Sequence, residues 1–558
     1  MAFVSLAPSR SGTGGALDLL RDCGGVKGFV QRLPSLARLA AGPDTPWPLL
    51  WCVTAVALIA LYLAPYVLPG MIPLLDLPNH LGVTRVLMDL GRGTTLDTYF
   101  VPNPNFTPYV LGYSLLTLCC KAFGTLGGAR AFLAAMVVSY ALSVLFLARV
   151  LRSNPWAALA SLPFAYHYGF IQGFINWIPA VPLLLASVGL VLRQMENPTA
   201  SRTVLLLAVG TALLLAPPLA SVGFMAAVAG SWLLRPRRGE AIWLQMLPAL
   251  ATAFPFYLLN RATPWMQFNK VRHMTAVEWI ERAWDVSTPL LNGRVDDWAL
   301  VGTWLSILAL VALAIVAAVR RQRAPGSGRA WWTRSHLLLP AATWLVISLA
   351  PMYVDGNAVA PRMMVFAYTF SLLGLSRELT GRRVAALAPG LLSSFVAGWV
   401  FLSSVLWFQR GPARDVERVL AHLPEGQVVL PLISGKDPGN PFHRGPYDHI
   451  GQYALALRAA VVPRSFARLP VAPVRYSGPG SRLRGEWRIG NLDVARVAPQ
   501  YGWLLVREPF TAEAELVFRT RHRLRRVSSA GTFWLYEIPG GARPHPPRGN
   551  PPGSATPK

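Results

Sequence analysis

An aspartate and a histidine four residues apart follow the first long apolar run of the sequence, in the segment LDLPNHL that begins at residue 75. A carboxylate placed where a chain leaves a membrane can act as a base or bind a metal ion. If a helix begins after Pro78, His80 shares one face with Thr84 and Leu87, and the segment reads as an amphipathic helix lying on the membrane. The alternative is a solvated loop in which Asp76 only caps a helix.

Basic residues that could hold a phosphate occur in two later segments. The stretch 261–298 contains Lys270 and Arg272 among several tryptophans, and Arg362 follows Asp355 just before another apolar run. Arginine and lysine bind phosphate oxygens through charge-assisted hydrogen bonds. The alternatives are that the tryptophans anchor the protein at the membrane interface and that Arg362 snorkels or pairs with Asp355.

The composition indicates an integral membrane protein. Of the 558 residues, 53% are hydrophobic and 14% are charged, and the mean hydropathy is +0.39. Soluble proteins have roughly 25% charged residues, so a soluble, fibrous or largely disordered chain is excluded. The net charge of +26 would suit a nucleic-acid binder, but lysine and arginine also collect on the cytoplasmic side of membrane proteins. The four cysteines match no disulfide framework or metal-site spacing.

Long uncharged runs predict about 11 transmembrane helices within residues 47–410. The run 153–192 is too long for one crossing and is expected to turn back at 173–176, and the run 203–234 is expected to break at Pro217-Pro218. Tyr109–Cys120 is apolar but short, which favours a half-embedded helix. If this segment does not cross, the five short inner loops hold 15 basic and three acidic residues, in agreement with the positive-inside rule.

This topology assigns a side to each remaining segment. Residues 1–46 are expected to be a largely disordered cytoplasmic segment, 69–130 and 261–298 outer loops, 411–540 a periplasmic or extracellular α/β domain, and 541–558 a disordered tail rich in proline and glycine. In the domain we predict helices at 413–423 and 449–460 and strands at 427–432, 501–508 and 532–538. His443, Asp448 and His449 form a polar cluster there, whose spacing fits no metal signature and favours surface or interdomain packing.

A first crossing, a long outer loop with an early aspartate and an interfacial helix together resemble the GT-C superfamily of membrane glycosyltransferases. The similarity extends to a poorly characterised bacterial branch and covers about 47–410; its motifs are DLPNHLGVTRVLMDLG from Asp76, LDTYF at 96–100, PNF at 104–106 and GFINWIPAVPLLLASVGLVLR at 173–193. GT-C enzymes carry an essential aspartate near the end of the first helix, and Asp76 matches it. Many also carry an acid in the next outer loop, where this chain has Asn176, which can hydrogen-bond a ligand but cannot act as a base.

The resemblance implies a multi-pass transferase of the bacterial inner membrane. It would move a sugar from a polyprenyl-phosphate donor to a lipid, glycan or protein acceptor on the outer face, without nucleic acid. Asp76 and His80 would be catalytic, and the residues expected to bind substrate or phosphate are Arg362, Arg272, Lys270, Asn176 and Asp355. The sequence does not decide whether a cofactor is needed; a divalent cation is one option, and no metal ligands are identified.

The alternative is a non-catalytic multi-pass membrane protein, either a transporter or a scaffold in envelope assembly. A transporter is expected to carry ionisable residues within its helices. The apolar runs of this chain contain almost none, which argues against transport.

Overall fold

The computed structural model describes residues 47–103, 109–234, 242–262, 271–272, 275, 294–322, 335–349, 353–354, 357–379, 381–433, 447–469, 471–485, 489 and 492–544. The chain divides into two compact units, Met1–Ala57 and Leu58–Lys558. The first contributes only the beginning of one helix to the described residues. All contacts given below lie within the second.

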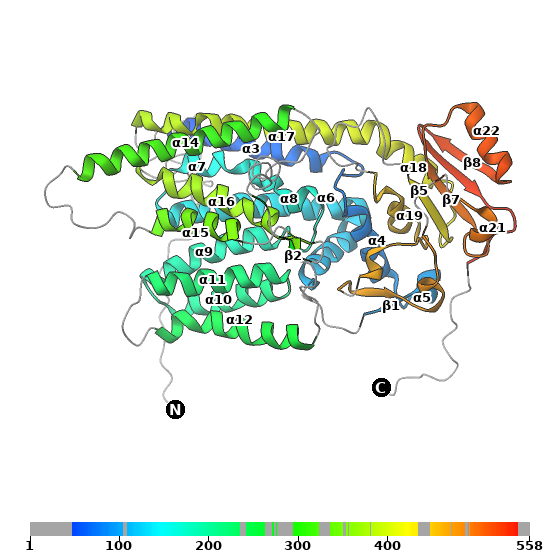
Figure 1. The fold of residues 1–558 in the computed structure, drawn as a ribbon, viewed down its shortest axis with the longest axis horizontal. Coiled ribbons are helices and arrows are strands. Elements are labelled where there is room, and N and C mark those ends of the chain that lie inside the picture. The colour runs from blue at the N-terminus through cyan, green and yellow to red at the C-terminus, as the bar shows by residue number, and fades with distance from the viewer. Residues whose placement is uncertain are drawn as a thin grey trace, which may run out of the picture. The chain divides into compact units, whose positions relative to one another are not determined.

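The first two-thirds of the described chain is helical (Figure 1). Its main apolar helices are α3 (Pro48–Val67), α6 (Val110–Leu151), α9 (Ala180–Glu196), α10 (Ala200–Leu214), α11 (Pro218–Leu234), α12 (Ile242–Ala262), α14 (Arg294–Gln322), α15 (Ser335–Leu349), α16 (Ala360–Leu375) and α17 (Ala388–Phe408). Shorter elements lie between them: α4 (Leu77–Asp89), α5 (Thr95–Tyr99), α7 (Pro155–Ala160), η1 (Leu162–Tyr166), α8 (Tyr168–Ile171), η3 (Ser376–Glu378) and η4 (Gly381–Leu387).

Among the described residues, three helical stretches are long and apolar enough to cross a membrane: Pro48–Val67, Val110–Leu151 and Gly381–Leu420. Several shorter apolar helices accompany them, and α10 and α11 separate at the predicted Pro217-Pro218 break. The structure therefore agrees with a largely helical membrane protein. It does not reproduce every predicted crossing as a continuous helix.

Residues 153–171 are the clearest difference from the sequence prediction. We expected one half of a helical hairpin here, but the segment consists of the three short helices α7, η1 and α8. Two of these helices are capped at their N-termini by side chains. Asn154 accepts a hydrogen bond from the backbone N–H of Trp156, and His167 accepts one from the backbone N–H of Phe170. Pro155 and Pro163 lack backbone N–H groups and occupy the starts of α7 and η1. Because these short helices are as apolar as a continuous one, hydropathy alone cannot show the breaks between them.

Helix α6 contains a sharp bend at Gly124. This glycine has φ +73° and ψ 171°, which ends the helix that began at Val110 and starts a second one. The two segments meet closely, because a Cβ on Gly128 would lie 2.4 Å from the Cα of Cys120. The short apolar stretch predicted at Tyr109–Cys120 is therefore a separate helical segment that continues to the bend.

Helix α17 joins the C-terminal region without a loop. It continues through the π-helix η5 (Gln409–Ala413) into α18 (Arg414–Leu420), and the helical stretch Gly381–Leu420 has 40 residues. The domain boundary that we predicted at 410/411 thus falls inside a continuous helical rod.

The C-terminal region is a small mixed α/β domain. Its sheet has the order β5-β7-β9-β8, in which β5 (Val429–Ile433) and β7 (Trp503–Arg507) are parallel, while β9 (Phe533–Glu537) is antiparallel to both β7 and β8 (Arg525–Ala530). Leu430, Leu504 and Leu535 are fully buried in it. The other elements are η6 (Ile450–Gln452), α19 (Tyr453–Arg458), η7 (Phe466–Arg468), α20 (Gly478–Ser481), α21 (Val494–Val497) and α22 (Ala512–Arg521).

Two small sheets join segments that are distant in sequence. β1 (Phe100–Pro102), which follows α5, pairs antiparallel with β6 (Val474–Tyr476) of the C-terminal domain. β2 (Val271–Arg272) pairs with β3 (Tyr353–Val354), which in turn pairs with β4 (Asn357–Ala358). Neither pairing has a period-2 signal long enough to be read from the sequence.

Candidate active site

Asp76 is the residue immediately before α4, but its side chain does not cap that helix. Its carboxylate makes no capping hydrogen bond, and Pro78, in the first turn, needs no N–H partner. The residue is only 9% exposed. The interpretation of Asp76 as a helix cap in a solvated loop is therefore wrong, because the carboxylate is both buried and free of the helix.

The turn after α8 fixes the backbone of Asp76. The Asp76 N–H donates to the carbonyl of Gln172 at 2.9 Å. Gly173 has φ +73°, and a Cβ there would lie 2.8 Å from the backbone nitrogen of Leu77, so only glycine fits without displacement. The two motifs on which the sequence resemblance rests, around Asp76 and around Gly173, thus meet in space.

His449 of the C-terminal domain reaches Asp76. Its Nε2 lies 3.3 Å from Oδ1 of Asp76, and the two side chains are 23% and 12% exposed. The ring of Phe466 packs edge-on against both His449 and His80, with centroids 6.0 Å and 4.8 Å away. Sequence reasoning favoured surface or interdomain packing over a metal site for His449, since no local pattern indicates a contact across more than 370 residues.

His80 lies one turn into α4 and is buried. Its Nδ1 is 2.8 Å from the hydroxyl of Tyr113. Burial, with a smaller contribution from the nearby His449, lowers the pKa of His80 from 6.5 to about 3. The ring is therefore neutral at physiological pH, and in this state Nδ1 can accept the hydrogen bond that the tyrosine hydroxyl donates.

Acid is expected to destabilise the protein through His80. The unfolded chain takes up this proton near pH 6.5 and the folded chain near pH 3, so the unfolded state binds more protons between these values. Stability is fully present above pH 6.5 and falls by about 1.4 kcal/mol per pH unit below it. The apparent Tm of His80→Gln should fall less steeply with acid than that of the wild type. Parallel Tm curves for the two proteins would contradict this account.

Arg362 lies near Asp76 in the same site. It is in the first turn of α16, and its guanidinium stacks over the ring of Phe174, 4.4 Å from the centroid. It interacts electrostatically with Tyr109, Tyr168 and Asp76. Within the described residues its Nε has no hydrogen-bond partner, and Arg362 and Asp76 form no direct ion pair. The site therefore holds a cation and a carboxylate that do not neutralise each other by contact.

The remaining predicted residues divide into two groups. Asn176 is buried beside Gly112, where a Cβ would lie 2.6 Å from its Oδ1, and this oxygen has no partner in the described part of the chain. Arg272 lies in β2, and the sheet β2-β3-β4 brings it to the strands that precede α16. Lys270 and Asp355 lie outside the described residues.

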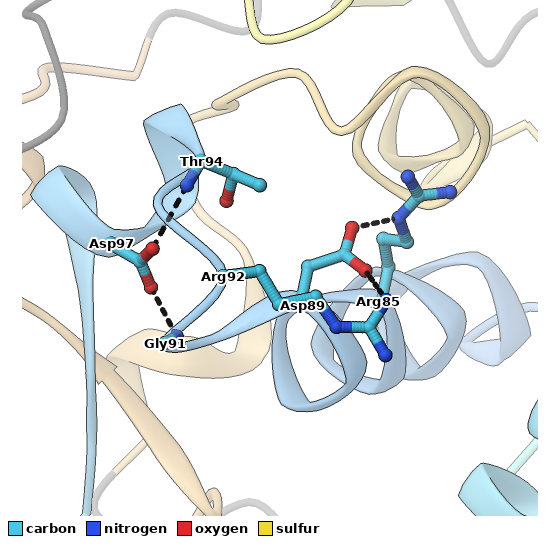
Figure 2. A network of polar contacts seen from close by, with 6 residues as sticks. All are labelled: Arg85, Asp89, Gly91, Arg92, Thr94 and Asp97. Carbon is cyan, nitrogen blue, oxygen red and sulfur yellow. Dashed lines mark hydrogen bonds and ion pairs between the residues drawn. The ribbon is translucent and has the colours of Figure 1, made fainter.

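The other carboxylate of α4 has a different environment. Asp89, at the far end of the helix, pairs with Arg85 and Arg92, and Asp97 accepts hydrogen bonds from the backbone N–H groups of Gly91 and Thr94 (Figure 2). These contacts fix the turn between α4 and α5. Asp89 is thus compensated by two arginines, whereas the contact of Asp76 is a histidine.

In the ranges that the structure describes, no group of three or more histidine, cysteine, aspartate and glutamate side chains is placed to hold a metal ion. Asp76 contacts His449 and interacts electrostatically with Tyr113 and Arg362.

A solved structure agrees with the fold resemblance that the sequence predicted. The chain is similar to ArnT from Cupriavidus metallidurans in the apo state, with a TM-score of 0.50 and 10% identity over 89% of this chain and 99% of that chain. The undecaprenyl phosphate-bound structure of ArnT from Cupriavidus metallidurans gives a TM-score of 0.47 at 10% identity, over 92% of this chain and 98% of that chain. No protein-family model and no curated protein matches the sequence. At this identity the likeness establishes the fold alone.

Proposed function

We propose that the protein is a membrane glycosyltransferase that moves a sugar from a polyprenyl-phosphate donor to a hydroxyl-bearing lipid, glycan or protein acceptor. The observation that carries the proposal is the electrostatic interaction between the buried Asp76 and the partly buried Arg362, in a fold similar to that of ArnT. Glycosyl transfer needs a group that receives the acceptor proton and a cation that stabilises the departing phosphate. These two residues supply both kinds of charge.

In the proposed reaction, Asp76 accepts the proton of the acceptor hydroxyl. The hydroxyl oxygen then forms a bond to the anomeric carbon of the sugar while the bond from that carbon to the phosphate oxygen breaks. The electron pair leaves with the polyprenyl phosphate, and the guanidinium of Arg362 stabilises the additional negative charge. Tyr109 and Tyr168 interact with Arg362 and would border the phosphate. His80 would serve as a neutral hydrogen-bonding group near Asp76.

Four further residues are proposed to bind substrate around Asp76 and Arg362: Arg272, Lys270, Asn176 and Asp355. For Arg272 the support is the sheet that links its strand to the segment leading into α16. For Asn176 it is a buried amide oxygen that lacks a partner among the described residues, a group that a bound sugar hydroxyl would satisfy.

Transfer can be measured with the purified full-length chain in lipid nanodiscs. Polyprenyl phosphates carrying a hexose, a pentose or an amino sugar serve as donors, and total membrane lipid serves as a source of acceptors. The proposal expects release of free polyprenyl phosphate from at least one donor. Absence of turnover with the whole panel would contradict it and favour a non-catalytic membrane protein.

We further propose an inner-membrane orientation in which the N-terminus is cytoplasmic and the C-terminal domain periplasmic. The basic loop around Asn197, between α9 and α10, would then be cytoplasmic. A reporter active only in the periplasm should be active when fused after Lys558 and inactive when inserted at Asn197. The reverse pattern would contradict the orientation.

A further inference from the structure

The C-terminal domain is bound to the segment that carries Asp76. α19 packs on α4 so closely that a Cβ at Gly82 would lie 2.9 Å from Leu455 (Figure 1). The β1–β6 pairing adds backbone hydrogen bonds, and the Ser477 N–H donates to the Tyr99 carbonyl at 2.9 Å. The Asn103 amide donates to the carbonyl of Ala472 at 2.8 Å. This docking determines where His449, just before η6, lies relative to Asp76.

His449 occupies a position between Asp76 and a hollow of the C-terminal domain. The hollow is small and partly open to solvent, and its polar lining includes Asp448, His449, Gln452 and Arg464. Gln452 is 5% exposed, and its amide donates to the carbonyl of Pro463 at 3.3 Å. One side of the His449 ring thus contacts the carboxylate while the residue also borders an open space.

We propose that His449 is a positioning residue for Asp76, supplied to the active site by the C-terminal domain. In this role the 3.3 Å contact between Nε2 and Oδ1 of Asp76 fixes the orientation of the carboxylate, so that its other oxygen is directed to the acceptor hydroxyl. A carboxylate without this contact could rotate, because the helix provides no capping bond to hold it. The proposal rests on the proposed function, since it assigns His449 a role at that same site.

The physical pairing can be tested without any activity. Thermal unfolding of the full chain in nanodiscs is measured for Asp76→Asn, His449→Phe and the double variant. Because the two groups are in contact, the fall in Tm of the double variant should be clearly smaller than the sum of the two single falls. Strictly additive falls in Tm would overturn the inference, even if the proposed function were wrong.

The positioning role is tested by transfer kinetics with the donor identified in the nanodisc assay. The amide of His449→Gln reaches nearly as far as Nε2 and can still donate to Asp76, so this variant should keep kcat within about threefold. His449→Phe keeps the ring but not the donor, and we expect kcat to fall about 10- to 100-fold with an unchanged KM for the donor. His422→Gln is the matched control, since His422 is an exposed histidine of the same domain.

Two outcomes separate the hypotheses. If the wild type transfers sugar and Asp76→Asn does not, but His449→Phe keeps the wild-type kcat, the positioning role is wrong while the proposed function stands. If the wild type transfers no sugar, the proposed function fails, and the thermal cycle alone decides whether His449 and Asp76 are coupled.

Discussion

Replacement of Asp76 by asparagine is expected to abolish sugar transfer while the protein stays folded. The amide has nearly the same shape as the carboxylate but cannot accept the acceptor proton, so kcat should fall by roughly 10²- to 10⁴-fold. The backbone hydrogen bond from Asp76 to Gln172 does not involve the side chain and is retained. Transfer from the polyprenyl-phosphate sugar and the apparent Tm are measured on the same preparation.

Asp89→Asn is the matched control for this variant. Asp89 is the other carboxylate of α4, and it is paired with Arg85 and Arg92 at the end of the helix far from the site (Figure 2). Its replacement should lower the Tm, because two arginines lose their partner, but keep kcat within about threefold. Wild-type transfer by Asp76→Asn, or equal losses in the two variants, would contradict a catalytic role for Asp76.

Replacement of Arg362 by glutamine is the second change with a large expected effect. The guanidinium is held over Phe174 and has no direct ion pair with Asp76, so its charge is available to a phosphate. Loss of one preorganised charge at a developing anion typically costs 10²- to 10³-fold, and we expect kcat/KM to fall by about this factor. Binding of undecaprenyl phosphate, measured by tryptophan fluorescence, should weaken in parallel.

Two further variants sharpen the test of Arg362. Arg362→Lys keeps the charge but loses the planar fork and the stacking surface, so its activity should fall between those of the wild type and the glutamine variant. Arg383→Gln removes an exposed arginine of η4 and should leave kcat/KM and binding unchanged. If Arg362→Gln binds and turns over the donor as the wild type does, the phosphate lies elsewhere.

Two segments of the candidate site could be located from the sequence because their motifs are local. The composition change after the first apolar run marked Asp76, and the Gly-Phe-Ile-Asn turn marked the segment that packs against it. Each is a short stretch in which proline or glycine, together with a polar residue, interrupts a long apolar run. Such interruptions are visible in one sequence because the backbone itself requires them.

The parts that could not be predicted depend on contacts between distant segments. His449 was one polar residue in a cluster without a metal signature, and its importance comes only from the docking of α19 on α4. The same holds for β1 and β6, which are three residues each and pair across more than 370 positions. The broken segment 153–171 was missed because its short helices are as apolar as a continuous one, and hydropathy cannot tell the two apart.

The central claim is that a polyprenyl-phosphate sugar binds with its phosphate at Arg362 and its anomeric carbon on the side of Asp76. An experimental structure of the full chain in nanodiscs, determined with a bound polyprenyl-phosphate monosaccharide, tests it most directly. The account predicts the phosphate within hydrogen-bonding distance of the Arg362 guanidinium and the anomeric carbon on the side of Asp76. A donor bound elsewhere, with neither residue in contact with it, would contradict the account.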